Sequence, residues 1–305
     1  MQARREIHVM AGVLSDDAGR VLIAQRPVGK HLAGRWEFPG GKLDGDEAPL
    51  AGLRRELAEE LGLELVAAEP LIRLHHDYND RRVLLDVWRV TEWSGTPQGL
   101  DGQAFQWVTP DELPTVDLLK ADRPIITALR LPRIARRIAG AGALVESVRH
   151  EHPQALFWDP LDAEAGSEEI REAVRAARRA GHRVIVCGED IRAARTAAAS
   201  GADGILLDPS GGMLSIDTRG AFVVGAICPT PRAAATAVAA GAHFLVLAPE
   251  GQIADAKKFA PLVHRLGLPV YLGWYPDDGS LELARSSGAH GCAIGPEKTP
   301  SADRA

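Results

Sequence analysis

The chain has 305 residues, of which 46% are hydrophobic and 25% are charged, and this composition is typical of a globular protein of about two domains. The net charge of −6 argues against a general nucleic-acid-coating role, and three scattered cysteines do not form a disulfide framework. No apolar run is long enough to span a bilayer, and the N-terminus lacks the pattern of a signal peptide. We therefore expect a cytoplasmic protein with no membrane partner and no direct nucleic-acid partner.

The first 131 residues mix short strands with two helices. Apolar runs at residues 7–14 and 21–25 predict two strands joined by a hairpin-like turn at 15–19. Runs at 71–76 and 83–92 predict a second strand pair with a turn at 78–80, and 105–108 predicts one more short strand. Helices are expected at 47–61 and 122–131. This order predicts an α+β domain over residues 1–131.

Three carboxylates lie on one face of the helix expected at 47–61. Glu56, Glu59 and Glu60 have the spacing i, i+3, i+4, which makes them neighbours on a helix. Side by side they repel one another unless a cation joins them, and hard oxygen ligands suit Mg²⁺, with Mn²⁺ as a second choice. The glycines at 40 and 41 allow the preceding backbone to approach a ligand closely. The pattern predicts a metal-assisted polyphosphate site; the alternative is an ordinary solvated acidic helix.

The wider spacing resembles the box of the Nudix hydrolases, G-x5-E-x7-R-E-U-x-E-E-x-G-U, in which U is aliphatic. Every fixed position is met, by Gly41, Glu47, Arg55, Glu56, Leu57, Glu59, Glu60, Gly62 and Leu63. The resemblance implies a Nudix fold, with a mixed sheet between helices, and hydrolysis of a nucleoside diphosphate linked to another group. It implies a metal held by Glu56, Glu59, Glu60 and the Gly40 carbonyl, and an Arg55 that orients a carboxylate such as Glu47. Which glutamate acts as the general base stays open.

The segments that flank the box resemble the MutT branch of this family, which sanitises oxidised nucleotide pools. The run at 31–42, HLAGRWEFPGGK, leads into the box as it does in that branch. The resemblance implies that Arg26 binds phosphate and that His31 and Phe38 lie near the base. It also implies a further catalytic carboxylate at Asp101, where glutamate is common, and a purine-reading side chain at Asp122. Asp122 could also serve as the N-cap of the helix that follows it.

The chain changes character after the first domain and alternates Ala-rich helices with short apolar strands. Gly-Ala pairs at 201–202, 241–242 and 288–289 each end a helix and lead into a strand. Further apolar runs at 155–158, 183–187, 222–227 and 269–273 predict a buried parallel sheet. We expect a (β/α)8-like TIM barrel of the α/β class at residues 143–300, after a linker at 132–142. A doubly wound sheet is the alternative.

The repeat resembles the thiamine phosphate synthase/TenI family of compact barrels. That family usually carries basic residues near the end of its second strand, but residues 157–160 read FWDP and contain no cation. The acids expected after the next two strands reduce to Glu189-Asp190 and Asp208, and Trp274 stands where the family has a glycine phosphate loop. We therefore expect a barrel without synthase activity, which binds a small ligand, regulates the hydrolase or forms a homodimer.

Together these resemblances imply an enzyme that uses Mg²⁺ to hydrolyse 8-oxo-dGTP, a nucleoside triphosphate, to 8-oxo-dGMP and pyrophosphate. Such an enzyme would serve nucleotide-pool sanitation, DNA repair and replication fidelity. The first alternative is a Nudix hydrolase for another nucleoside diphosphate derivative, such as ADP-ribose. The second is a ligand-binding protein related to thiamine phosphate synthase.

Overall fold

The computed structural model describes residues 5–78, 80–160, 166–189, 191–208, 222–248, 261–276 and 278–295. The chain divides into two compact units, one comprising Met1–Arg130 with His264–Gly267 and the other Leu131–Val263 with Leu268–Ala305. Among the described residues, no helix has both the length and the apolar character needed to cross a membrane. Asn79, in the turn predicted at 78–80, and Asp190 lie outside the described residues.

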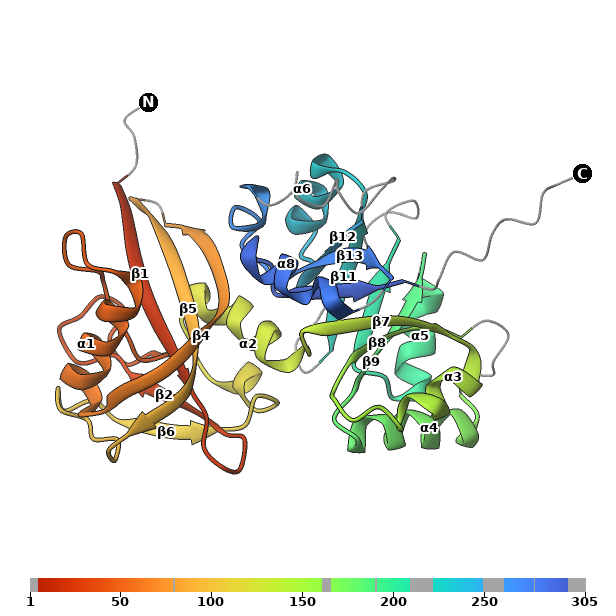
Figure 1. The fold of residues 1–305 in the computed structure, drawn as a ribbon, viewed down its shortest axis with the longest axis horizontal. Coiled ribbons are helices and arrows are strands. Elements are labelled where there is room, and N and C mark those ends of the chain that lie inside the picture. Colours follow the sequence, from red (N-terminus) through yellow and green to blue (C-terminus); the bar gives the residue numbers. More distant parts are fainter. Residues whose placement is uncertain are drawn as a thin grey trace, which may run out of the picture. The chain divides into compact units, whose positions relative to one another are not determined.

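The N-terminal unit contains two three-stranded sheets, ordered β1-β5-β4 and β3-β2-β6. Their strands are β1 (Arg5–Leu14), β2 (Val21–Gln25), β3 (Trp36–Glu37), β4 (Glu64–Asp77), β5 (Arg81–Ser94) and β6 (Phe105–Val108). β1 and β5 are parallel, whereas the other pairs in these two sheets are antiparallel. The pairing is therefore mixed, as predicted (Figure 1).

The predicted hairpin between the first two strands is wrong. β1 and β2 belong to different sheets, and only an isolated bridge between Ser15 and Val21 joins this region. β1 has ten residues, and β5 supplies a partner for each of them, from Arg5 with Arg81 to Leu14 with Val90. β2 pairs instead with β3 and β6. The local turn signal was correct, but the two strands that the turn joins belong to different sheets.

Helix α1 (Pro49–Leu61) begins two residues later than predicted and carries the box. Leu53, Leu57 and Leu61 follow one another at every fourth position, are completely buried and pack in one cluster with Met10 and Leu14 of β1. The helix ends at Gly62, whose φ of 67° suits glycine and lets its N–H donate to the Ala58 carbonyl. The buried leucine face therefore leaves the acidic box residues on the accessible side of the helix.

Helix α2 (Arg123–Arg130) covers the opposite face of the strands, after short 3₁₀ turns at Leu113–Thr115 and Lys120–Asp122. Its Ile125 and Ala128 pack in a second cluster with Ala11 and Val13 of β1. Alternate residues of β1 thus face α1 and α2, which is the arrangement expected for a strand between two helical layers. The predicted Nudix architecture is confirmed.

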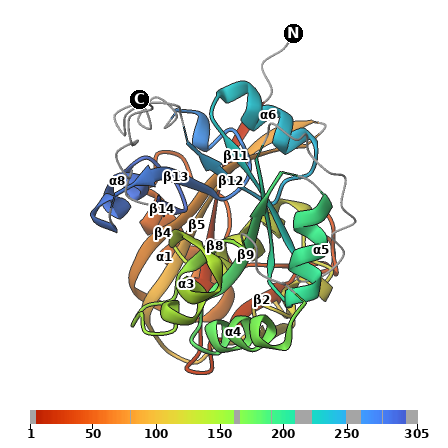
Figure 2. The same ribbon diagram turned by 90° about the vertical axis from the view of Figure 1, so that its right-hand side faces the viewer.

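The C-terminal unit contains a closed barrel of eight parallel strands in the order β10-β11-β12-β13-β14-β7-β8-β9 (Figure 2). The strands are β7 (Ile134–Ala139), β8 (Ala155–Asp159), β9 (Arg183–Gly188), β10 (Gly204–Leu207), β11 (Val223–Cys228), β12 (Phe244–Leu247), β13 (Val270–Tyr275) and β14 (Gly291–Ile294). The helices described between them are α3 (Gly140–Ser147), α4 (Glu168–Arg179), α5 (Ile191–Ser200), α6 (Pro231–Ala239) and α8 (Leu281–Ser286). The predicted TIM-like barrel is confirmed, and the doubly wound alternative is excluded.

The linker predicted at residues 132–142 is wrong. Residues 134–139 form β7, which pairs with β14 on one side and β8 on the other and so closes the barrel. The sequence of this strand, IARRIA, contains two adjacent arginines that hide its apolar pattern. The strand is needed because a barrel without it would leave two exposed edges.

Candidate active site

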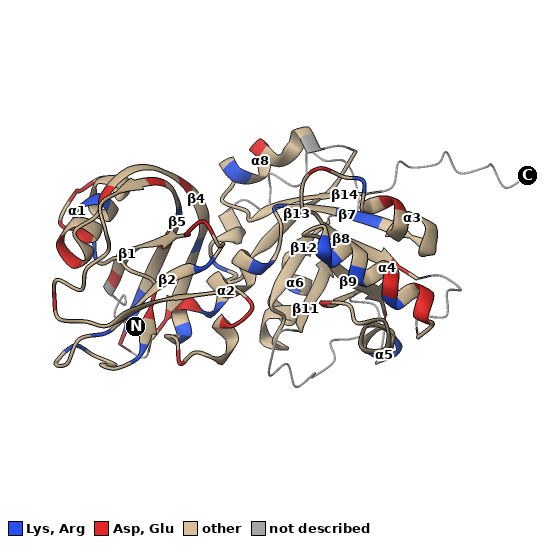
Figure 3. Ribbon diagram, turned by 90° about the horizontal axis from the view of Figure 1, so that it is seen from below, with Lys and Arg blue, Asp and Glu red and all other residues tan. Residues whose placement is uncertain are grey.

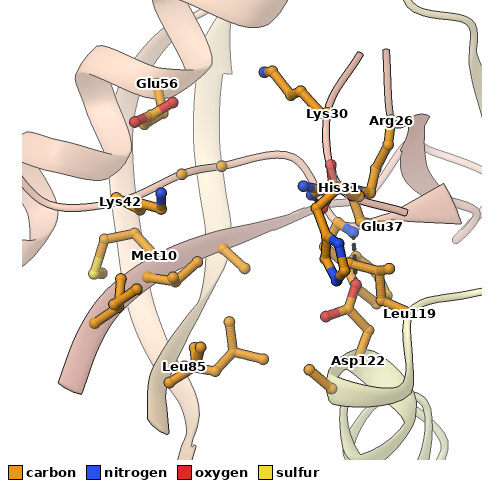
Figure 4. Close-up of a pocket in the computed structure, with 18 of the residues that line it drawn as sticks. Met10, Arg26, Lys30, His31, Glu37, Lys42, Glu56, Leu85, Leu119 and Asp122 are labelled. Atoms are coloured by element: carbon orange, nitrogen blue, oxygen red, sulfur yellow. Dashed lines mark hydrogen bonds and ion pairs between the residues drawn. The ribbon is translucent and has the colours of Figure 1, made fainter. Parts of the chain in front are cut away.

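A cavity of about 540 Å³ opens in the N-terminal unit between α1, the strands and the 3₁₀ turn at Lys120–Asp122. That volume lies within the range of small-molecule sites. One side is acidic and includes Glu56 and Glu60 of α1, whereas the other includes His31, Glu37 and Asp122 (Figure 4). The cavity therefore brings Asp122 together with side chains that come more than 60 residues earlier in the sequence.

The loop before α1 lies against β1. The N–H of Met10 donates to the Gly41 carbonyl at 2.7 Å, and the N–H of Gly12 donates to the Pro39 carbonyl at 2.8 Å. The carbonyl of Gly40, between these two, accepts no hydrogen bond from any residue that the structure describes. Gly40 has a φ of +143°, and a Cβ there would lie 2.2 Å from the Met10 carbonyl oxygen. Only glycine fits here, and Gly40 lines the cavity, where its N–H donates to Glu60 Oε2 at 3.4 Å.

Arg55 organises the acidic side of the site. Its guanidinium contacts both oxygens of Glu47, with Nε–Oε1 at 3.2 Å and Nη2–Oε2 at 3.0 Å, as the resemblance implied. Nη1 also lies 3.0 Å from Glu56 and 3.1 Å from Glu59. Hydrogen bonding to Arg55 lowers the pKa of Glu47, and hydrogen bonding to Glu47 and Glu56 raises the pKa of Arg55. Figure 3 shows the acidic positions that gather on α1.

Glu56 and Glu60 are the most enclosed carboxylates of the box helix. Their side chains are 14% and 17% exposed, whereas the side chain of Glu59 is 60% exposed and contacts Arg55. Burial raises the pKa of Glu56, and burial raises the pKa of Glu60 to about 7. These two side chains are one turn apart on the same face of α1, which directs both into the cavity.

The chemistry of this donor set fits a hard divalent cation. Glu56, Glu60 and the Gly40 carbonyl offer oxygen ligands, and burial raises the pKa of both carboxylates, so a bound cation would favour their charged forms. Within the described residues, however, no three His, Cys, Asp or Glu side chains already converge in a metal-binding arrangement. Glu59 lies outside the cavity lining, so the predicted trio of glutamates is not assembled.

Asp101 lies at the margin of the site and is not part of the cavity lining. Its carboxylate is 46% exposed and lies 3.5 Å from the ammonium of Lys30, which is also 3.7 Å from Glu60. Gln103, which sequence reasoning left without a role, holds this loop: it accepts from the Asp101 N–H and donates to the Glu60 carbonyl. The loop is therefore fixed to the C-terminal turn of α1.

Asp122 lies at the other side of the cavity and is only 5% exposed. Its Oδ2 accepts a hydrogen bond from the Phe38 N–H at 3.2 Å. Burial, together with the charge of Glu37, raises the pKa of Asp122 to about 8. Asp122 ends the 3₁₀ turn that precedes α2, so its side chain is directed to Phe38 and not to the helix as a cap.

Arg26 is engaged within the protein. Its Nη1 forms an ion pair with Glu37, and its Nε donates to the His31 carbonyl at 2.8 Å. This places Arg26 in the cavity lining, but as a support for the loop that carries His31. Sequence reasoning missed Glu37, although it lies inside the WEFPGGK run and burial raises its pKa.

His31 and Phe38 both line the cavity beside Asp122, but they contribute differently. His31 is exposed, whereas Phe38 is 3% exposed and belongs to the core that packs against α2. The lining also includes Lys30, Tyr78 and Arg81, which no sequence motif indicated. Each comes from a loop or a strand end, where neither apolar periodicity nor the box spacing carries information.

Comparison with known proteins agrees with this geometry. A family model described as the NUDIX domain matches residues 9–128. An 8-oxo-dGTP diphosphatase of Proteus vulgaris is 44% identical over 93 residues, which are 30% of this chain and 83% of that protein. The CTP pyrophosphohydrolase of Escherichia coli is 38% identical (43% of this chain, 96% of that protein), and the E. coli 8-oxo-dGTP diphosphatase is 30% identical (41% and 98%). The chain belongs to the Nudix family, and its N-terminal domain is a Nudix hydrolase.

Proposed function

We propose that the N-terminal domain hydrolyses oxidised purine nucleoside triphosphates, with 8-oxo-dGTP converted to 8-oxo-dGMP and pyrophosphate. The observation that supports this most is the cavity itself, which has carboxylates and the Gly40 carbonyl on one side and the buried Asp122 on the other. A nucleotide has the same polarity, since its phosphates and its base lie at opposite ends. Removal of such nucleotides would protect the fidelity of DNA replication.

The acidic side is proposed to hold Mg²⁺ through Glu56, Glu60 and the Gly40 carbonyl, with Mn²⁺ as a substitute. When bound, such an ion neutralises phosphate charge and lowers the pKa of a water molecule. Arg55, which does not line the cavity, positions the Glu56 carboxylate through a hydrogen bond of 3.0 Å. Glu47 accepts a second hydrogen bond from the same guanidinium and so fixes its position. Glu59 is proposed to balance the charge of Arg55, with which it pairs at 3.1 Å.

Asp122 is proposed to read the base. A pKa of about 8 leaves its carboxyl group protonated at neutral pH. Its Oδ2 already accepts from the Phe38 N–H, so the proton is best placed on Oδ1, where it can donate a hydrogen bond. A donor suits the keto oxygen of a guanine ring. His31, exposed at the same side of the cavity, is proposed to contact the sugar or base.

A second candidate is a pyrimidine triphosphate. The chain matches 96% of the length of the relative named CTP pyrophosphohydrolase and is 38% identical to it. Cytosine presents an amino donor where guanine presents a keto acceptor, and a donor facing a donor is unfavourable. The protonated Asp122 therefore favours the guanine nucleotide.

The barrel is proposed to act as a ligand-binding domain without thiamine phosphate synthase activity. The residues at 157–160 that end β8 contain an acid and no cation, and Trp274 fills the place of a glycine loop. A bulky residue prevents the close backbone approach that phosphate binding at a glycine loop needs. Residues 143–300 remain the proposed extent of the resemblance to the thiamine phosphate synthase/TenI family.

The reaction is tested by its products. Wild-type protein incubated with 8-oxo-dGTP and Mg²⁺ should release pyrophosphate and the monophosphate, which phosphorus NMR distinguishes from orthophosphate and the diphosphate. The same incubation with Glu56→Gln should leave the triphosphate intact, although the variant keeps its fold. Release of orthophosphate instead, or equal turnover by the variant, would contradict the proposal.

A further inference from the structure

Strand β7 brings a cation into the interior of the barrel. Ala135 of this strand is completely buried within the interior cluster, and residues two apart on a strand share a face, so Arg137 also points inward. Arg136 points the other way and donates from Nε to Gln154 at 3.3 Å. The two adjacent arginines therefore have different environments, and only Arg137 lies within the barrel.

Arg137 lies two residues before the carboxyl end of β7, at the level of Phe157 on the neighbouring strand. The rings of Phe157, Phe244 and Tyr271 are fully buried, with centroids 5.7–6.1 Å apart, and they fill the interior of the barrel. The guanidinium carbon of Arg137 lies 5.6 Å from the ring centroid of Trp274, which is half-buried. In parallel barrels, ligands bind at this end of the strands.

The guanidinium of Arg137 is not held by an ion pair in the described part of the structure. Arg137 makes no hydrogen bond and no ion pair with any described residue, although it is half-buried. Burial raises the pKa of the neighbouring Cys187 to about 12, so this thiol stays neutral and does not balance the charge. The carboxylate of Asp159 shares the inner face of β8 but forms no ion pair with Arg137. An inward guanidinium with five N–H donors calls for an acceptor from outside the protein.

We propose that Arg137 anchors an organic oxyanion, a carboxylate or a phosphate monoester with an apolar body, inside the carboxyl end of the barrel. The planar fork of a guanidinium matches both kinds of oxyanion with two parallel hydrogen bonds. Trp274 and Ile227 are half-buried apolar side chains against the same interior cluster, and they offer surface for the body of the ligand. The site does not depend on the hydrolase domain or on a metal.

Arg137 provides, from the adjacent strand, the cation that β8 lacks. The register pairs Arg137 of β7 with Phe157 of β8, so the guanidinium comes from the adjacent strand at the same level. The sequence concealed this cation because residues 132–142 read as a linker. The six residues of β7 (Ile134–Ala139) therefore both close the barrel and carry the proposed anion-binding arginine.

The full-length protein, with tryptophan labelled with ¹⁵N and EDTA present, tests the proposal by NMR. The Trp274→Phe variant assigns the indole signal of Trp274. Benzoate and phenyl phosphate serve as the two organic probes, and acetate and inorganic phosphate as the bare oxyanions. We expect a saturable shift of the Trp274 signal with at least one organic probe, and tighter binding of that probe than of its bare oxyanion. The stronger probe then identifies the class of oxyanion.

Arg136→Met is the matched control, since it removes the same charge from the outer face of the same strand. We expect it to bind as wild type does, whereas Arg137→Met should bind about tenfold more weakly or not at all, the usual cost of losing a charge-assisted contact. Arg137→Lys keeps the positive charge but loses the planar guanidinium, so its affinity for the probe should lie between those of the two methionine variants. It replaces Arg137→Met if that variant does not fold. No shift of Trp274 with any probe, or equal affinity in the Arg136 and Arg137 variants, would overturn the proposal.

Discussion

The Cα of Gly41 faces the carboxylate of Glu56 so closely that a Cβ at position 41 would lie 2.2 Å from Glu56 Cδ. Fifteen residues separate the two in sequence, and both are fixed positions of the box. The spacing of the box therefore records a contact in space: the glycine leaves room for the carboxylate that the helix presents. This contact gives the first test of the site.

Gly41→Ala should reduce turnover by about 100-fold or more, the scale that a misplaced catalytic group can cost. The added methyl group displaces the flexible end of Glu56, and Gly41 has no positive φ, so the fold should remain stable. Steady-state kinetics and a thermal melt measure the two effects. Gly142→Ala, where a Cβ meets nothing within 4 Å, is the control and should leave turnover unchanged. If the Gly41→Ala variant is largely unfolded at the assay temperature, the loss of turnover would reflect lost stability and would contradict this explanation.

The box glutamates should differ in importance. Glu56→Gln and Glu60→Gln, which alter the enclosed carboxylates, should each weaken metal binding and lower kcat by about 100-fold or more. Glu59→Gln should have a smaller effect because this side chain is 60% exposed and contacts Arg55. Titration with Mn²⁺ followed by electron paramagnetic resonance measures binding without any substrate. Equal losses in all three variants would show that Glu59 is a ligand, as the sequence alone predicts.

Arg55→Lys should behave as a non-conservative change. A lysine cannot contact both oxygens of Glu47 while it also reaches Glu56, so Glu56 would lose its support. We expect kcat to fall about tenfold or more with little change in KM, since Arg55 does not line the cavity. Adding Glu47→Gln to this variant should cost little more, because the contact is already broken. Fully additive losses would show that the two residues act separately.

The sequence predicted much of the fold because periodic apolar patterns are local. The buried leucines of α1, the strand at 105–108 and the repeated Gly-Ala turns of the barrel all lie where those patterns place them. The errors have physical causes. The partner of β1 is β5, which lies 67 residues further along the chain, and β7 contains two arginines in an apolar strand.

The box motif predicted the acidic side of the candidate site, but the cavity's other side depends on tertiary contacts. The ion pair of Arg26 with Glu37, and the buried hydrogen bond from the Phe38 N–H to Asp122, join segments that only the fold brings together. Lys30 comes from a loop, and no spacing rule connects it to Glu60. A sequence motif contains only residues at a constant spacing, so it does not reveal contacts between segments that are brought together by the fold.

Asp122 should make stability depend on pH. Its pKa is about 8 in the folded protein against an ordinary value of 3.8, so the folded state binds this proton more tightly. The resulting stabilisation is complete below pH 3.8 and is lost as the pH rises toward 8. The melting temperature of wild type minus that of Asp122→Asn should therefore fall between pH 4 and pH 8 and stay level above it. We expect a change of about 4 °C or more, which corresponds to about 1 kcal/mol in a domain of this size.

The asparagine variant isolates this effect, since Glu60, whose pKa is raised to about 7, titrates in both proteins. Wild-type kcat/KM for the guanine nucleotide should decline above pH 8, where Asp122 loses its proton, and Asp122→Asn should remove this decline because an amide keeps its donor. A pH-independent difference in melting temperature would mean that Asp122 is ionised in the folded protein at neutral pH.

The substrate of the hydrolase domain is tested by comparing kcat/KM for 8-oxo-dGTP, dGTP, CTP and ADP-ribose with the full-length protein, in Mg²⁺ and in Mn²⁺. We expect 8-oxo-dGTP to have the highest value with either ion, and Glu56→Gln to abolish every activity. A higher value for CTP or ADP-ribose, or no preference for 8-oxo-dGTP over dGTP, would contradict this expectation.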